Sequence, residues 1–193
     1  MRLTLLSLLT ILSLSATSHA QVPVFKTTPE GSSINFYVKA SVALVGKFDK
    51  WKASLKFPSS DVTSGVLDIR IDAATVNTGS GMKDKKLKSK DFFDVEESTA
   101  ITFHSTKVVQ TGPTSFDVMG DFSIRGVSKP ETLKLTVSGK GTGNGVVKGI
   151  MAFDRKDYGM TSGIPFVKIA DRVEVDVDLK VQQISGPRLV YKE

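Results

Sequence analysis

The feature of this chain that most restricts its fold is a period-two alternation of apolar and polar residues. It is clearest in Arg172–Gln182, where Val and Leu alternate with Glu, Asp and Lys. Such alternation predicts a β-strand with one dry face and one wet face. The same pattern recurs in seven further segments: Ser33–Val42, Lys50–Phe57, Gly65–Ala73, Ala100–Gln110, Ser115–Ile124, Glu131–Lys140 and Gly145–Asp154. The sequence therefore predicts eight strands.

Residues that favour turns separate these segments, and the links between the last four strands are short. Short links favour antiparallel pairing of consecutive strands. A sheet of eight amphipathic strands must either curl into a barrel or split into a sandwich to bury its apolar face. A closed eight-stranded barrel has an interior that side chains fill or that holds one ligand. Periodicity alone does not choose between barrel and sandwich.

Residues 1–20 have a different character from the rest of the chain. A positive start at Arg2 is followed by the apolar run Leu3–Leu14 and by the small residues Ser18 and Ala20. This is the pattern of a secretory signal peptide, and the apolar run is too short to span a bilayer. We therefore predict an exported protein in which residues 21–193 form a single domain.

Composition excludes several kinds of chemistry. The absence of Cys rules out disulfides, thiol catalysis and cysteine zinc sites. Within residues 21–193 a single histidine, His104, remains, and its alternation with Thr102 and Thr106 predicts an exposed position. No P-loop, dinucleotide fingerprint or nucleophile elbow is present. We predict no metal site, no cofactor and no catalytic activity.

One long segment, Ala74–Thr99, lacks the alternation. Within it, Lys83–Asp91 holds five Lys and two Asp and precedes Phe92 and Phe93, which predicts a short helix around residues 82–93. The lysines either attract a phosphate group or an anionic membrane surface, or they form a solvated face that aids solubility. Aromatic residues are not interleaved with these lysines, so we do not expect nucleic-acid binding.

Several strings, taken in order and spacing, carry a family resemblance over roughly Val24 to Gln183. They are Asn77–Gly79, Lys83–Asp84, Leu87–Val95, Ile101–Ser105, Gly120–Pro130 and Phe153–Met160. Together they resemble the YceI-like lipid/polyisoprenoid-binding family of exported bacterial proteins. The resemblance implies an all-β fold: an extended, eight-stranded antiparallel lipocalin-like barrel with the short helix in the connection around residues 82–93.

The resemblance also implies a function. Members of this family hold an isoprenoid-type amphipathic lipid, such as an isoprenoid quinone or a polyprenyl phosphate, in an apolar interior. We therefore expect a periplasmic carrier for transport or storage that makes transient contact with a membrane surface, and the resemblance makes a homodimer plausible.

The apolar faces of the predicted strands and the two aromatics after the helix supply candidate contacts for such a lipid. The predicted lipid-binding residues are Phe36, Val38, Trp51, Phe57, Ile69, Ile71, Phe93, Phe103, Phe122 and Phe153. Lys83, Lys86 and Arg125 are the predicted head-group contacts. Burial of hydrocarbon yields ~0.8 kcal/mol per methylene, so ~10 buried carbons would drive binding without a specific polar contact.

Two alternatives from other classes stay open at this point. The same apolar residues could fill the core of a β-domain that acts as a structural or interaction module without a ligand. The chain could also be an enzyme acting on a lipid, which would depend on Asp121, Asp154 or Asp157. These carboxylates lie at predicted strand ends, where charged residues ordinarily face water and pair locally.

Overall fold

The alternating segments form strands in the computed structural model, which describes residues 21–41, 43–163 and 169–192. The predicted signal peptide, residues 1–20, lies outside the described residues. The strands are β1 (Val24–Ala40), β2 (Leu44–Phe48), β3 (Trp51–Lys56), β4 (Val66–Asp72), β5 (Val76–Asn77), β6 (Ala100–Gln110), β7 (Ser115–Ile124), β8 (Val127–Ser138), β9 (Asn144–Asp154) and β10 (Ile169–Ser185).

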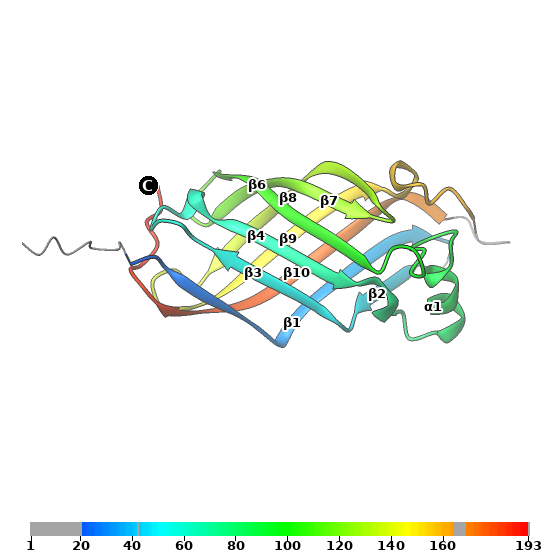
Figure 1. Cartoon of the computed structure of the whole chain (residues 1–193), viewed down its shortest axis with the longest axis horizontal. Helices are drawn as coiled ribbons and strands as arrows, with labels where there is room; N and C mark the ends of the chain where they lie inside the picture. Colours follow the sequence, from blue (N-terminus) through cyan, green and yellow to red (C-terminus); the bar gives the residue numbers. More distant parts are fainter. Residues whose placement is uncertain (1–20, 42, 164–168, 193) are drawn as a thin grey trace, which may run out of the picture.

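Eight of these strands close into an elongated antiparallel barrel (Figure 1). The order is β10-β9-β8-β7-β6-β4-β3-β1, and β1 pairs with β10 to complete the ring. This last ladder runs from Val24 opposite Ser185 to Ala40 opposite Ile169. The predicted eight-stranded antiparallel barrel is thus confirmed, and the sandwich is not formed.

Period-two alternation translates directly into burial. On β10, Val173, Val177 and Leu179 point into the barrel and are buried, whereas Glu174 and Lys180 are exposed. Burial of each such aliphatic side chain stabilises the fold by ~1.5–3 kcal/mol relative to exposure. The dry faces of all eight strands meet in one core inside the barrel.

Two short strands and a longer β1 differ from the expectation. β2 pairs with the second half of β1, with Tyr37 opposite Val45, and β5 pairs with β2. Both strands are too short for alternation to stand out in the sequence. β1 begins nine residues before Ser33 and carries an irregularity between Thr28 and Ser33, where the strand turns sharply (Figure 1). Pro29 lies in this irregularity, a place where a strand tolerates proline.

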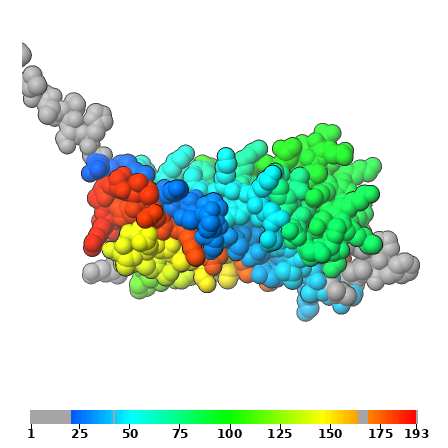
Figure 2. Space-filling view, turned by 90° about the horizontal axis from the view of Figure 1, so that it is seen from below, coloured from blue at the N-terminus to red at the C-terminus, as the bar shows by residue number. Residues whose placement is uncertain are grey.

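The helix is shorter than predicted. α1 spans Gly81–Lys88 and ends at Ser89 rather than at Phe93, and the Phe93 N–H donates to the Leu87 carbonyl at 2.9 Å as the chain folds back. Short 3-10 turns occur at η1 (Val62–Ser64), η2 (Ala73–Thr75) and η3 (Arg155–Tyr158). The α1 segment covers one end of the barrel and the C-terminal segment lies at the other (Figure 2). No helix in the described part of the chain has the length and apolarity to cross a membrane.

Candidate functional site

The barrel interior is divided along its long axis into two apolar cavities and a packed layer between them. On β6, for example, Ile101 lines the cavity near α1, Val108 lines the cavity near the C-terminal segment, and Phe103 lies between the two. The strands β4, β7, β9 and β10 repeat this order. We call these regions the helix-end cavity, the C-terminal cavity and the middle layer.

The helix-end cavity has a volume of about 60 Å³. It is lined by Ile34, Phe36, Val38, Leu44, Phe48, Ile71, Leu87, Phe92, Phe93, Ile101, Phe122, Ile124, Phe153, Arg155, Met160, Ile169, Val173 and Val175. Aromatic rings dominate its walls: the Phe36 and Phe93 centroids lie 6.3 Å apart in an edge-on arrangement, and those of Phe122 and Phe153 lie 5.0 Å apart. Such ring pairs favour a dry, well-packed wall.

Among the described residues that line this cavity, Arg155 has the one polar side chain, and it is 6% exposed. Its guanidinium donates to the carbonyls of Met160, Ser162 and Ala170 and pairs with Asp171 at 3.0 Å. The expectation that the charged residues of this segment face water is therefore wrong for Arg155. A buried guanidinium needs these partners, and here they fasten the chain around the rim of the barrel.

Tyr158 closes the wall beside the same cavity and is fully buried. Its hydroxyl donates to Glu131 Oε1 at 3.0 Å, while its ring packs edge-on against Phe122 and Phe153. Burial, reinforced by the Glu131 carboxylate, raises the pKa of Tyr158 far above its ordinary value. The side chain therefore stays neutral and serves as a structural donor.

The C-terminal cavity has a volume of about 80 Å³. It is lined by Phe25, Leu55, Phe57, Val62, Gly65, Leu67, Val108, Phe116, Val118, Leu135, Val137, Val147, Val181, Leu189 and Tyr191. Leu189 and Tyr191 come from the segment after β10, and the Tyr191 ring lies 6.1 Å from that of Phe116. Lys140 Nζ also lies over the Tyr191 ring, 4.2 Å from its centroid.

The middle layer consists of buried inward-facing residues that line neither cavity. They are Ala53, Ile69, Phe103, Ser105, Gly120, Leu133, Gly149, Met151, Val177 and Leu179. Its two glycines make room for large neighbours. A Cβ on Gly120 would lie 2.8 Å from the Phe103 ring, and one on Gly149 would lie 2.7 Å from Leu135. The small residues thus allow bulky side chains to fill the centre of the barrel.

The predicted lipid-binding residues are distributed over these regions. Phe36, Val38, Ile71, Phe93, Phe122 and Phe153 line the helix-end cavity. Phe57 lines the C-terminal cavity, whereas Ile69 and Phe103 lie in the middle layer. Trp51 is half-buried and lines an open groove on the outer face of the barrel instead.

The predicted head-group residues are not gathered at one point. Lys83 is exposed on α1, while Lys86 pairs with Asp91 at 2.6 Å. Arg125 donates to the carbonyls of Gly159 and Lys90, which ties the segment after α1 to η3, and its Nε is buried without a hydrogen-bond partner. Two of the three cations are therefore already engaged within the chain.

Sequence reasoning missed several residues that shape the helix-end cavity. Leu87 and Phe92 come from the segment around α1, and Phe48 comes from the short strand β2. The adjacent aromatics Phe92 and Phe93 were a usable signal, because two apolar rings after a lysine-rich helix favour docking onto a core. No local pattern marks Arg155 as buried, since its partners belong to residues 160–171.

The exposed polar residues perform structural tasks. His104 lies on the wet face as predicted, with Nδ1 2.6 Å from Asp68 Oδ1. Asp154 accepts from the Lys156 N–H at 2.8 Å and caps η3, while Asp157 pairs with Lys129 at 3.3 Å. Among the described residues, no group of three or more His, Asp or Glu side chains is placed to hold a metal ion.

Comparison with known proteins places this architecture in context. A family model described as the YceI-like domain matches residues 25–181. A UPF0312 protein of Vibrio parahaemolyticus is 30% identical over 120 residues, which cover 61% of this chain and 64% of that protein. A UPF0312 protein of Pseudomonas syringae pv. syringae is 33% identical over 96 residues, half of each chain. The match thus spans less than two thirds of the length of these relatives.

Solved structures share the fold at lower sequence identity. BcnA of Burkholderia cenocepacia superposes with a TM-score of 0.73 at 24% identity, covering 80% of this chain and 99% of that one. A polyisoprenoid binding domain from Saccharophagus degradans gives a TM-score of 0.67 at 17% identity, covering 83% and 99%. A Campylobacter jejuni YceI protein carrying a monobromobimane guest gives 0.61 at 23% identity, covering 74% and 85%.

Proposed function

Because this chain belongs to the YceI-like family, whose model matches residues 25–181, we propose that it is a carrier that binds one isoprenoid-type amphipathic lipid inside its barrel. The observation that carries the proposal is the interior itself. Both cavities are lined by apolar side chains with Arg155 and Tyr191 as the exceptions among the described residues, and they lie in line along the barrel axis. An extended hydrocarbon chain is the ligand that matches such an interior.

The cavities set a condition on binding. Their volumes of about 60 and 80 Å³ are smaller than the ~150 Å³ apolar cavity that accommodates benzene. A prenyl chain therefore has to displace side chains of the middle layer and join the two cavities. The gain of ~0.8 kcal/mol per buried methylene offsets the cost of that rearrangement once about ten carbons are inside.

The polyisoprenoid-binding domain from Saccharophagus degradans supports this proposal through its shared fold. Family membership and this neighbour favour a binding protein over an enzyme. Two of the three carboxylates named for an enzymatic mechanism are engaged, since Asp154 caps η3 and Asp157 pairs with Lys129. The isoprenoid tail of a quinone and that of a polyprenyl phosphate both suit the apolar interior. We propose that the role is transport or storage of such a lipid.

One observation favours the second candidate, a filled β-barrel that acts as an interaction module. The middle layer is closed by large side chains, with Phe103 5% exposed and Leu179 fully buried. In that case the cavities are ordinary packing defects, and no lipid would be taken up. The two candidates therefore differ in a direct measurement.

The test is mass spectrometry of an organic extract of the purified mature protein, with an unrelated exported protein as the control. One stoichiometric isoprenoid species is the expected result. An empty extract, together with no uptake when prenyl lipids are offered, would contradict the carrier and leave the filled module.

We further propose that the protein works in the periplasm and contacts an anionic membrane surface transiently through α1. Met82 is 85% exposed on this helix, and the lysines beside it suit anionic lipid head groups. Vesicle co-sedimentation should show weak binding that a Met82→Asp change reduces. A homodimer stays a prediction that analytical ultracentrifugation would check.

A further inference from the structure

The barrel wall is interrupted between β1 and the β2–β3 segment. β1 pairs with β2 over Asn35–Val38 and with β3 at Val24, and in the described ladders no pair lies between these two points. The irregularity of β1 between Thr28 and Ser33 lies at this interruption. The two edges are bridged at one point by the Thr27 hydroxyl, which donates to the Ala53 carbonyl at 2.6 Å.

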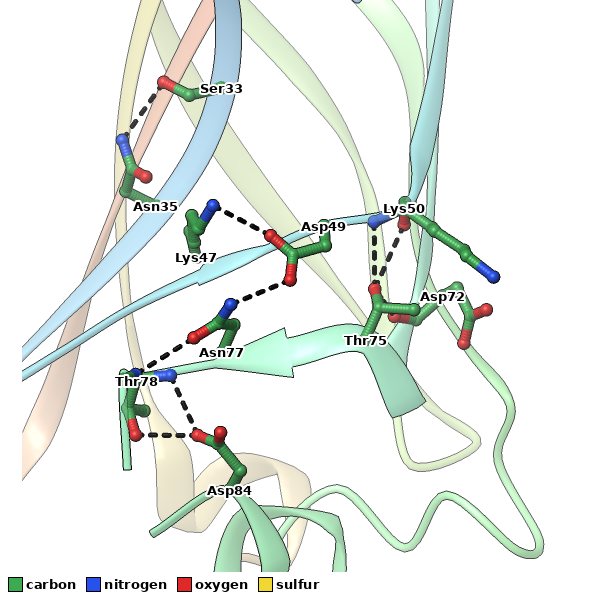
Figure 3. Close-up of polar contacts among 11 residues, drawn as sticks. Ser33, Asn35, Lys47, Asp49, Lys50, Asp72, Thr75, Asn77, Thr78 and Asp84 are labelled. Carbon is green, nitrogen blue, oxygen red and sulfur yellow. Dashed lines mark hydrogen bonds and ion pairs between the residues drawn. The ribbon is translucent and has the colours of Figure 1, made fainter. Parts of the chain in front are cut away.

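Opposite this irregularity, the backbone between β2 and β3 bonds away from β1. The Asp49 N–H donates to the Thr75 carbonyl at 3.1 Å, and the Lys50 N–H donates to Thr75 Oγ1 at 3.0 Å (Figure 3). The Asp72 N–H donates to the Lys50 carbonyl at 3.0 Å. Because these backbone groups of Asp49 and Lys50 are bonded to residues 72–75, they are not available to pair with β1. The interruption is therefore part of the fold.

Another interruption of the wall, between β8 and β9, is closed by side chains. The β8–β9 ladder covers Lys134–Ser138 of β8, and the preceding part of β8 contacts η3 through the Glu131–Tyr158 hydrogen bond and the Lys129–Asp157 ion pair. Among the described residues, the Thr27 hydroxyl is the side chain that bridges the interruption beside β1. An open groove of about 940 Å³ lies there instead.

The groove carries an excess of positive charge. Its lining includes the cations Lys47, Lys50, Lys52 and Arg70 and the carboxylates Asp49 and Asp72. Lys47 pairs with Asp49 at 2.9 Å, and a hydrogen bond from Asn77 together with Lys47 holds the pKa of Asp49 below its ordinary value (Figure 3). This carboxylate is thus neutralised locally.

The second carboxylate is also committed, because Asp72 accepts the Ala74 N–H at 3.1 Å and caps η2. Within the described ranges, Lys50, Lys52 and Arg70 make no ion pair with any carboxylate. In this part of the chain, three of the four lining cations are therefore free of ion pairs, and they outnumber the one lining carboxylate, Asp72, that no lysine or arginine neutralises. Lysine and arginine in this arrangement suit a phosphate group, which arginine binds through two parallel hydrogen bonds.

A single ring separates this groove from the interior. Phe48 lines both the groove and the helix-end cavity and is 7% exposed. Its centroid lies 5.6 Å from that of Phe36 and 5.8 Å from that of Phe93, so inward it belongs to the apolar wall. A charged surface and a dry cavity thus meet across one side chain.

We propose that the groove is the subsite for the phosphate head group of an amphipathic lipid, whose tail passes beside Phe48 into the helix-end cavity. This inference rests on the proposed lipid-binding function. It assigns the head group to Lys50, Lys52 and Arg70 on the barrel wall, whereas Lys86 and Arg125 near α1 are engaged within the chain.

The chain supplies its own reporter for the test. Trp51 is the one tryptophan in the sequence, and it lines the groove. A head group that binds beside it should change the tryptophan emission. Binding of the tail is followed independently by native mass spectrometry of the complex.

The experiment compares a polyprenyl monophosphate with the uncharged polyprenol of the same chain length, using the full mature protein. The groove variant is Lys50→Gln/Lys52→Gln/Arg70→Gln. The matched control is Lys107→Gln/Lys134→Gln/Arg188→Gln, which removes three exposed cations elsewhere on the barrel. We expect the groove variant to bind the phosphate about tenfold more weakly and the polyprenol unchanged, because three exposed contacts to an anion sum to about that factor. The control should bind both lipids like the wild type.

The remaining outcomes separate the two proposals. If the wild type binds the polyprenol and the groove variant retains full affinity for the phosphate, the head-group subsite is overturned and lipid binding stands. A selective loss in Lys83→Gln/Lys86→Gln instead would move the head group to α1. Inorganic pyrophosphate that alone changes Trp51 emission with the affinity of the lipid would make the groove a free-anion site. If neither lipid binds to the wild type, both proposals fail.

Discussion

The two cavities of this barrel are alike in volume and lining but differ in how their ends are held. The helix-end cavity is covered by residues around α1, and Arg125 ties Lys90 of this cover to Gly159, while Arg155 binds the carbonyls of Met160 and Ser162 at the same end. The C-terminal cavity is covered by Leu189 and by Tyr191, whose ring packs against Phe116 and Lys140. The same segment forms hydrogen bonds between Val190 and both Ser60 and Val62, and between Lys192 and the Gln110 side chain. One end is held by arginine side chains, whereas the other is held by main-chain and amide hydrogen bonds together with packing.

This difference indicates how the ends respond to perturbation. Directional bonds to buried groups break together when one donor is lost, because each carbonyl left behind in a dry site is costly. A cover held by exposed hydrogen bonds and ring packing is lost in smaller steps, since water replaces a lost partner and the free energy of packing scales with buried area. The helix end should therefore resist opening until one of its arginine donors is removed. The C-terminal end should open by smaller amounts as individual contacts are lost.

The largest effect is expected from removing the separation between the two cavities. Phe103→Ala should lower the free energy of unfolding by about 3–5 kcal/mol, the usual cost of deleting a buried ring, and should join the two cavities. Urea unfolding measures the loss, and Phe103→Leu, which keeps most of the volume, is the control. In a lipid carrier the joined cavity should also take up prenyl lipid faster than the wild type. Equal stability of Phe103→Ala and wild type would contradict a packed middle layer.

The second effect should be confined to the helix end. Arg155→Ala leaves three carbonyls without their donor and should cost about 3 kcal/mol. Hydrogen exchange should rise at residues 159–163 and 169–172, which include the carbonyls that Arg155 binds, more than at residues 186–192. Lys156→Ala is the matched control, because Lys156 is exposed and pairs with the same Asp171 at 2.7 Å, so its loss should cost under ~1 kcal/mol. Uniform loosening of both ends would remove the contrast between them.

A smaller effect is expected at the opposite end. Tyr191→Ala removes a half-buried ring that packs against Phe116 and Lys140 and should cost about 1–2 kcal/mol. Tyr191→Phe keeps the ring and should be close to neutral. The readout is again hydrogen exchange, now with the increase at residues 186–192. An increase at α1 of the same size would show that the two covers are coupled.

The smallest expected effect is the loss of stability at low pH. Hydrogen bonds lower the pKa of three carboxyl groups toward the helix end: Asp171 through Lys156, Asp91 through Lys86 and Asp49 through Asn77. Near the C-terminal cavity the pKa of Asp61 is lowered, chiefly by a hydrogen bond from the Thr63 backbone. A lowered pKa in the folded state stabilises the fold above the ordinary value of 3.8, and this stabilisation is lost as the pH falls below it.

Hydrogen exchange corrected for its intrinsic pH dependence should therefore show the helix end loosening first between about pH 4 and pH 2, the range below the ordinary carboxyl pKa. Asp171→Asn should flatten this acid response at the helix end while leaving the C-terminal end as it was. An acid response of equal size at both ends would contradict the assignment.

Much of the fold follows from features that a sequence displays locally. The alternation that predicted the strands is longest in β10, because a dry barrel interior imposes that pattern on each wall strand. β2 was missed because its inward residues are Leu44, Gly46 and Phe48, a run too short to be distinguished from a loop. The helix was predicted too long because Phe92 and Phe93 lie in a turn after α1, where the chain folds back onto Leu87.

The arrangement of the interior was beyond local patterns. Alternation marks Phe36, Phe57 and Phe103 as equally inward, yet they fall in three different regions along the barrel axis. Depth along the axis depends on strand register and on the positions of glycines such as Gly120, which only the paired strands reveal. The buried position of Arg155 likewise depends on carbonyls that come from a later segment.

Closure of the ring by β1 and β10 has a consequence for how the chain folds. The first and last described strands are partners over nearly their whole lengths, with Val24 opposite Ser185, so the wall is completed by the contacts most distant in sequence. Loops of this size are entropically costly to close, which slows folding in proteins dominated by such contacts. Until β10 arrives, β1 and β9 present long unpaired edges that invite pairing with other chains. A chain truncated before β10 should therefore aggregate rather than form a smaller barrel.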